Sequence, residues 1–98
     1  MQFSVKTANY QKQSMLNICD AELLGKKIIE GDLTMHISEN YYGKRFVEKD
    51  EAESLLNNSS IINMAGKETI SLALQLGIGS ENAVKLVSDV PFLIIFNM

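Results

Sequence analysis

The most reactive side chains of this 98-residue chain are one cysteine, Cys19, and one histidine, His36. A nucleophilic thiolate needs a base beside it, and His36 is the one histidine available for that role. However, Cys19 follows the apolar run Met15-Leu16-Asn17-Ile18, and a buried cysteine usually packs as an inert hydrophobic group. A structural zinc site takes four Cys or His ligands, and this chain has only these two residues of those types. The sequence therefore predicts no catalytic residue, metal site or cofactor, and it favours a protein that is not an enzyme.

The segment Gly66-Lys67-Glu68-Thr69 precedes an apolar helical stretch and invites comparison with a phosphate-binding loop. That loop needs glycine at position 61 and Ser or Thr at position 68, where this chain has Ile61 and Glu68. The free N–H groups at a helix start still attract an anion, although Glu68 opposes one. Gly66 and Lys67 are therefore either plain helix-capping residues or a site for an anionic ligand.

The segment Tyr41-Tyr42-Gly43-Lys44-Arg45 combines two aromatic rings with two cations. Aromatic rings fill protein pockets or stack on bases, and adjacent cations meet carboxylates or phosphates. Tyr41, Tyr42, Lys44 and Arg45 are therefore the predicted contact patch for a partner. The alternative is one tyrosine packed on the core beside a basic turn in water.

The C-terminal run from Phe92 to Phe96 is entirely apolar. It is either a core strand or an exposed sheet edge that pairs with another chain by strand addition. In the second case the chain forms a homo-oligomer through this strand.

Composition restricts the partners and the compartment. The net charge is -3, whereas proteins that bind nucleic-acid backbones usually carry excess Lys and Arg, so strong binding to free nucleic acid is not expected. A single cysteine cannot form an intramolecular disulfide, which favours the reducing cytoplasm. The N-terminus lacks an export signal, and no apolar run approaches the roughly 20 residues that span a bilayer. We expect a cytoplasmic protein without a membrane segment.

Apolar and polar residues alternate as in strands over much of the chain. The predicted strands are Phe3–Lys6 and Met15–Ile18, joined as a hairpin, then Leu33–Ile37, Arg45–Val47, Val84–Val87 and Phe92–Phe96. Ser38–Gly43 is expected to be a loop, and Ile61–Met64 is a buried strand or an extension of the next helix. Helices are predicted over Glu48–Asn57, where acidic residues suit the positive helix end, and over a central buried segment around Ile70–Leu76. The predicted fold is α/β of the α+β type: a single domain, residues 1–98, with a small mixed sheet, an N-terminal β-hairpin and two or three short helices.

The stretch Cys19-Asp20-Ala21-Glu22-Leu23-Leu24-Gly25-Lys26 joins a strand end to a short helix. Asp20 is expected to cap that helix with its side chain, and Leu23 and Leu24 are expected to anchor it on the core. Gly25 can adopt the left-handed conformation that ends a helix. This stretch is therefore expected to be mainly structural.

The chain resembles a family of uncharacterised archaeal proteins, domain of unknown function 424. The resemblance spans about Phe3 to Pro91, with Cys19, Asp20, Gly25 and Lys26 as marking residues; its motifs are Cys19–Lys26, Glu30–Leu33, Ser38–Gly43, Asn63–Lys67 and Leu76-Gly77. It implies an archaeal cytosolic protein with a compact α/β fold and no established activity. Where the family commonly has a histidine after Val-Pro, this chain continues into Phe92–Phe96.

Two hypotheses for function remain. The first is a non-catalytic binding module that docks on a protein or a ribonucleoprotein, such as the translation machinery, through Tyr41, Tyr42, Lys44 and Arg45. The second is a small enzyme or ligand-binding protein that holds an anionic group at Gly66 and Lys67, with Cys19 or His36 nearby.

Overall fold

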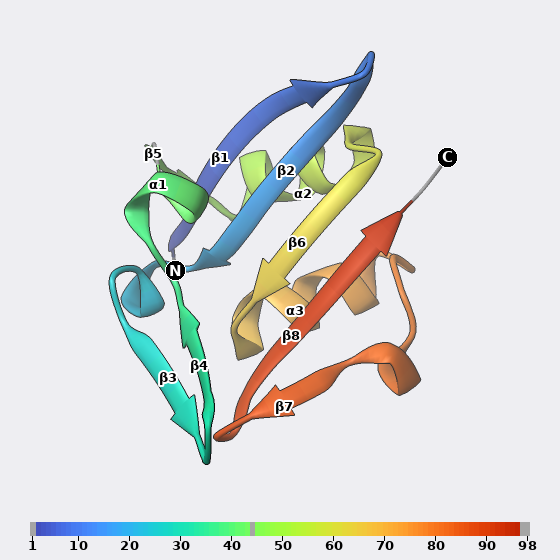
Figure 1. The fold of residues 1–98 in the computed structure, drawn as a ribbon. Helices are drawn as coiled ribbons and strands as arrows, with labels where there is room; N and C mark the ends of the chain where they lie inside the picture. The colour runs from blue at the N-terminus through green and yellow to red at the C-terminus, as the bar shows by residue number, and fades with distance from the viewer. Residues whose placement is uncertain (1, 44, 97–98) are drawn as a thin grey trace.

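A mixed β-sheet forms the middle layer of the protein (Figure 1). The computed structural model describes residues 2–43 and 45–96, and within these ranges six strands make up this sheet. All neighbouring strands are antiparallel except β2 and β6, which run parallel. In spatial order the strands are β5 (Arg45–Glu48), β1 (Gln2–Tyr10), β2 (Gln13–Asp20), β6 (Ile61–Ala65), β8 (Val90–Phe96) and β7 (Lys85–Val87).

The predicted N-terminal hairpin is β1 and β2, which pair from Phe3 opposite Asp20 to Tyr10 opposite Gln13. Its turn residues Gln11 and Lys12 have φ of 49° and 69°, the left-handed values that fit the twist of a two-residue hairpin. Both strands extend beyond the predicted segments, because the polar residues on the two sides of the turn also pair with each other.

Two helices cover one side of the sheet, which we call the back face (Figure 1). They are α2 (Lys49–Asn58) and α3 (Lys67–Gln75), and α3 is the predicted buried helix. Asp50 and Glu51 lie in the first turn of α2, where the helix dipole favours negative charge. The main core fills this layer and consists of Phe3, Val5, Leu16, Ile18, Val47, Ala52, Leu56, Ile62, Met64, Ile70, Leu72, Ala73 and Leu93.

The opposite side, the front face, is covered only in part. A separate two-stranded hairpin, β3 (Lys27–Glu30) and β4 (Leu33–His36), and the short helix α1 (Glu39–Tyr42) lie over it (Figure 1). They enclose a second core of Cys19, Ile28, Ile37, Tyr42, Ala65 and Val87. The two remaining short elements are the 3-10 turns η1 (Ala21–Leu23) and η2 (Glu81–Ala83). No helix among the described residues is long and apolar enough to span a membrane.

The α+β fold class is confirmed, with two local corrections and one open alternative resolved. Ser38–Gly43 is not a loop, since Ser38 caps the helix α1 by accepting a hydrogen bond from the backbone N–H of Tyr41. Ile61–Met64 belongs to a strand, because it pairs with β2 and β8. Asp20 makes no capping bond to η1. Gly25 does take the left-handed conformation after η1, with φ of 88°.

Candidate functional site

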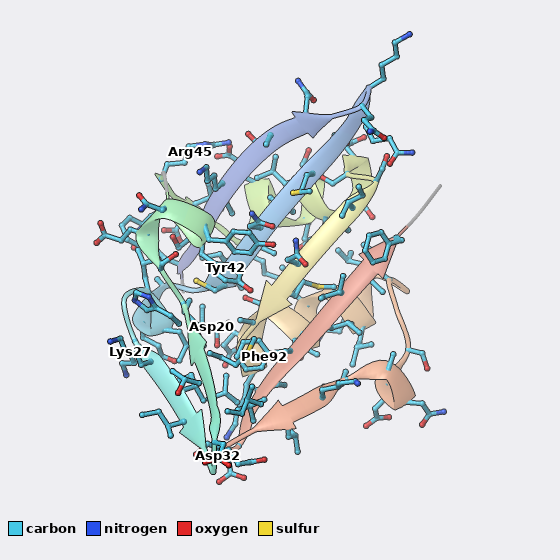
Figure 2. The ribbon with its side chains drawn as sticks, in the orientation of Figure 1. Asp20, Lys27, Asp32, Tyr42, Arg45 and Phe92 are labelled. Carbon is cyan, nitrogen blue, oxygen red and sulfur yellow. The ribbon has the colours of Figure 1, made fainter. Side chains whose placement is uncertain are left out.

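The predicted contact patch divides into parts that face different ways. Tyr41 is 45% exposed, whereas Tyr42 is only 7% exposed and belongs to the second core. Arg45 forms an ion pair with Glu51 of α2 at the edge of the sheet, and Figure 2 shows it pointing away from Tyr42. Lys44 lies outside the described residues. Tyr42 is therefore mainly a core residue, and of this patch Tyr41 is the aromatic surface residue.

Burial explains the position of Tyr42 and its chemistry. Its ring meets that of Tyr41 edge to face, with 5.1 Å between the ring centroids, and its backbone carbonyl accepts a hydrogen bond from Ser4 Oγ. Burial raises the pKa of Tyr42 to about 12, with smaller contributions from Tyr41 and Cys19. Its hydroxyl stays neutral at physiological pH, and its buried ring and the hydrogen bond from Ser4 anchor α1 on the sheet.

Tyr41 lies over two asparagines that sequence reasoning missed. Asn17 of β2 and Asn63 of β6 are paired residues, and Asn63 Nδ2 donates to Asn17 Oδ1 at 2.7 Å. Asn63 Nδ2 also donates to the Tyr41 hydroxyl at 3.1 Å, and Asn17 Nδ2 donates to the Tyr41 backbone carbonyl at 2.9 Å. The signal in the sequence was a polar residue inside each of two apolar runs, Leu16-Asn17-Ile18 and Ile62-Asn63-Met64.

This arrangement leaves two hydrogen-bonding groups unused. Asn63 donates through Nδ2, and no described residue donates to its Oδ1. Likewise the Tyr41 hydroxyl accepts from Asn63, and its own hydrogen has no acceptor among residues 2–43 and 45–96. No fully buried side-chain N or O atom of the described residues lacks a partner, and Asn63 is 8% exposed, so its Oδ1 has a small contact with solvent. A free acceptor and a free donor therefore lie side by side on the front face.

Cross-strand register shows what surrounds this pair. One front-face row runs from Lys6 through Asn17 and Asn63 to Ile94. The next row runs from Ala8 through Met15 and Ile61 to Phe96. Both rows lie beyond the second core. We call this region the open face: Tyr41, the row with Asn17 and Asn63, and the apolar row with Met15 and Ile61. Tyr41 is its exposed side chain, whereas Asn17, Asn63 and Ile61 are 5%, 8% and 8% exposed beneath it.

The helix start at Gly66 and Lys67 already holds an anionic group, the carboxylate of Asp20. Asp20 Oδ2 accepts from the backbone N–H of Glu68 at 3.1 Å, and Oδ1 accepts from the N–H and the hydroxyl of Thr69 at 2.8 and 2.7 Å. Asp20 thus caps α3 instead of the neighbouring turn η1. The amides of Glu68 and Thr69, at the helix start where Gly66 and Lys67 were the predicted anion site, are bonded to this carboxylate.

Gly66 is required for this close approach. A Cβ atom at Gly66 would lie 2.3 Å from Asp20 Cγ, and its φ of 110° is strained for any other residue. The cavity beside it measures about 250 Å³ and has acidic side chains on its wall, including Asp20, Glu22, Glu68 and Asp89. Lys67 supplies the one cationic side chain of that lining. The electrostatics of this cavity disfavour a second anion.

Cys19 and His36 do not form an accessible reactive pair. Cys19 is fully buried in the second core, and burial raises the pKa of its thiol to about 12, with a smaller contribution from Asp20. His36 is exposed on β4. Within the described residues, no group of His, Cys, Asp or Glu is arranged to hold a metal ion.

Gly25 and Lys26, which also mark the family resemblance, lie just before β3 and act through their backbone groups. Gly25 donates its N–H to the carbonyl of Ile37 at 2.7 Å, and the carbonyl of Lys26 accepts from the N–H of Ile37 at 2.9 Å. These bonds join the start of the β3–β4 hairpin to its end. The Lys26 side chain is exposed.

Comparisons with known proteins concern the family and the fold. The family model described as protein of unknown function (DUF424) matches residues 8–98. The crystal structure of an uncharacterized conserved protein from Methanopyrus kandleri is similar, with a TM-score of 0.77 at 22% identity, over 100% of this chain and 95% of that chain. At that identity the likeness concerns the fold alone. No curated protein matches the chain.

Proposed function

The chain belongs to the DUF424 family of proteins of unknown function, and we propose that it is a non-catalytic module that binds a partner protein through the open face. The supporting observation is the free donor of Tyr41 beside the free acceptor of Asn63. A peptide group in a partner chain offers the complementary C=O and N–H.

The surroundings of this pair favour a protein over RNA as the direct ligand. The row beside it, Met15 and Ile61 with Phe96 at its end, is apolar. Lys6, the cation at the end of the row with Asn17 and Asn63, already donates to the backbone carbonyl of Asn40. The chain is also acidic overall, which weakens attraction to a nucleic-acid backbone. An aromatic side chain with polar groups beside an apolar strip is typical of protein-binding surfaces. The partner is accordingly a protein, free or as a component of a ribonucleoprotein.

The buried state of Cys19 supports a role without catalysis. A thiol whose pKa is raised to about 12 stays protonated and is a poor nucleophile at neutral pH. A buried thiol of this kind suits the reducing cytoplasm, which we propose as the compartment.

Affinity capture with matched variants tests this proposal. The wild type and Tyr41→Phe are immobilised and exposed to RNase-treated cytosol, and each retained protein is purified and titrated by calorimetry. Tyr41→Phe keeps the ring and removes the donor, so affinity should fall about two- to tenfold, the loss of one hydrogen bond worth about 0.5–1.5 kcal/mol. Tyr41→Ala should lower it further, because the ring contact is lost too.

Phe46→Ala is the control, because Phe46 is an exposed aromatic residue on the edge strand β5 and belongs to neither row of the open face. A partner that binds the wild type and this control equally, and Tyr41→Phe more weakly, supports the proposal. Equal binding by all variants contradicts it. Binding that disappears on RNase treatment would make RNA the direct ligand and would also overturn it.

A further inference from the structure

We propose that two copies of this chain form a dimer in which their β8 strands pair antiparallel across the free edge of the sheet. The proposal does not depend on the partner-binding role of the open face. It rests on the geometry, composition and register of the C-terminal strand.

The outer edge of β8 is paired over only part of its length. β7 is three residues long and pairs with Val90, Pro91 and Phe92. The turn at Ser88 and Asp89 has φ of 47° and 67°, so Val87 and Val90 form the hydrogen-bonded closing pair of a two-residue hairpin.

Along β8, the backbone N–H and C=O groups of successive residues therefore point alternately towards β6 and towards the outer edge of the sheet. Pro91 faces β6, as its carbonyl shows by accepting from Gly66 N–H at 2.9 Å. By the same alternation Leu93 and Ile95 face β6, whereas Ile94 and Phe96 direct their N–H and C=O groups outward. In the described part of the chain no hydrogen bond to these outward groups is found.

The two free edges of the sheet differ in composition. On the β1 side, β5 pairs only with Gln2–Val5, and the unpaired stretch carries Lys6, Thr7 and Asn9. Polar and charged residues of this kind protect an edge against further pairing. The unpaired stretch of β8, Leu93–Phe96, is apolar throughout, so this edge lacks that protection. It also carries no charge, so two copies meet there without local repulsion despite the net charge of -3.

The free edge is complementary to itself. With the two-fold axis at Ile95, Ile94 of one copy pairs with Phe96 of the other, and the reverse pair forms as well. Both are outward-facing residues, so the two pairs can each exchange two hydrogen bonds. Their side chains are 58% and 69% exposed in the single chain, and each pair places a β-branched residue beside an aromatic one on the front face. This register covers the two most exposed side chains of the strand without leaving the sheet plane.

Symmetry sets the orientation of the two open faces in the dimer. Antiparallel neighbours in one sheet are related by an axis perpendicular to it, so both front faces lie on the same side. The dimer would therefore present two Tyr41 sites on one continuous sheet, with the Ile94 and Phe96 side chains between them.

Sedimentation equilibrium and hydrogen exchange test the dimer on the full chain. The wild type should have twice the mass of one chain, and the amides of Ile94 and Phe96 should be protected from exchange. Phe96→Lys should be monomeric with an unchanged circular dichroism spectrum, because this side chain is exposed in the monomer. Ile94→Lys should behave in the same way. Phe46→Lys, on the opposite edge strand and 54% exposed, should remain dimeric.

Three results would overturn the proposal. The first is a wild type that is monomeric up to millimolar concentration, including one whose Ile94 amide becomes protected only when another protein is added. The second is a dimer whose Ile94 and Phe96 amides exchange freely, since that contact would not be strand pairing. The third is a dimer that Phe96→Lys and Ile94→Lys leave intact.

Discussion

Substitution of Asp20 tests the claim that its carboxylate anchors α3 to the end of β2. The Asp20 side chain is 5% exposed and accepts three hydrogen bonds, two from the backbone N–H groups of Glu68 and Thr69 and one from the Thr69 hydroxyl. In Asp20→Ala these three donors lose their acceptor, and the positive end of the helix loses its negative charge.

The expected cost follows from these contacts. Loss of a helix cap costs about 0.5–2 kcal/mol, and each buried donor left without a partner costs about 1–3 kcal/mol. Water from the adjacent cavity can satisfy part of this demand, so we expect Asp20→Ala to lower the free energy of unfolding by about 3 kcal/mol. For a domain of this size that corresponds to a fall in Tm of about 12–24 °C. Asp20→Asn keeps an acceptor for Thr69 and should cost about half as much.

Urea denaturation of four proteins measures the effect and isolates its cause: the wild type, Asp20→Ala, Thr69→Val and the double variant. Thr69→Val should cost about 1 kcal/mol in the wild type and almost nothing in Asp20→Ala, where the hydroxyl has already lost its acceptor. Glu22→Ala, an exposed neighbour, is the control and should change stability by less than about 0.5 kcal/mol. A cost below about 1 kcal/mol for Asp20→Ala, or equal costs of Thr69→Val in both backgrounds, would refute the reasoning.

Three further predictions concern the same region. Gly66→Ala should lower the free energy of unfolding by more than about 2 kcal/mol in urea titrations, because the new Cβ meets the Asp20 carboxylate and the backbone is strained; near-neutral behaviour would contradict this. Inorganic phosphate should leave Tm unchanged, since Asp20 occupies the helix amides, and a rise would support the anion-binding hypothesis for Gly66 and Lys67. Cys19 should resist thiol reagents until the protein unfolds, and stability should fall as the pH rises from 9.0 towards about 12, because the unfolded thiol ionises first; rapid labelling of the native protein at pH 8 would refute its burial.

Local sequence patterns predicted most of the strands and helices, but they did not predict which distant segments pair with or cap one another. Alternation over Phe3–Lys6 and the apolar run at Met15–Ile18 identified the hairpin, because its pairing joins residues close in sequence. The parallel pairing of β2 with β6 joins residues about 46 positions apart, as in the Asn63 to Asn17 bond, and no local pattern encodes it. The interpretation of Asp20 was wrong for the same reason. A capping aspartate was recognised, but the helix that it caps begins 47 residues later, at Lys67, not at the next residue.

The candidate site shows a similar division. Tyr41 and Tyr42 are adjacent and equally aromatic, so the sequence left open whether both lie on the surface or one packs on the core, and it could not say which one. Helix geometry separates them, since successive residues of α1 point in different directions and the β3–β4 hairpin encloses Tyr42. The asparagines gain their importance from register alone, because only the β2–β6 pairing brings Asn17 and Asn63 together below Tyr41.

The parallel pair also bears on where the proposed partner would bind. In open sheets with parallel strands, ligands usually bind beyond the carboxyl ends of the strands, where helix N-termini converge. Here β2 and β6 end at Asp20 and Ala65, and α3 begins immediately after Gly66. The carboxylate of Asp20 fills this position and bonds the amides that would otherwise receive an anion. Free hydrogen-bonding groups with apolar neighbours lie elsewhere, at Tyr41 and Asn63 on the open face and at Ile94 and Phe96 on the edge of β8. Both locations offer peptide-like donors and acceptors beside apolar side chains, which suits recognition of another polypeptide better than chemistry on a small anion.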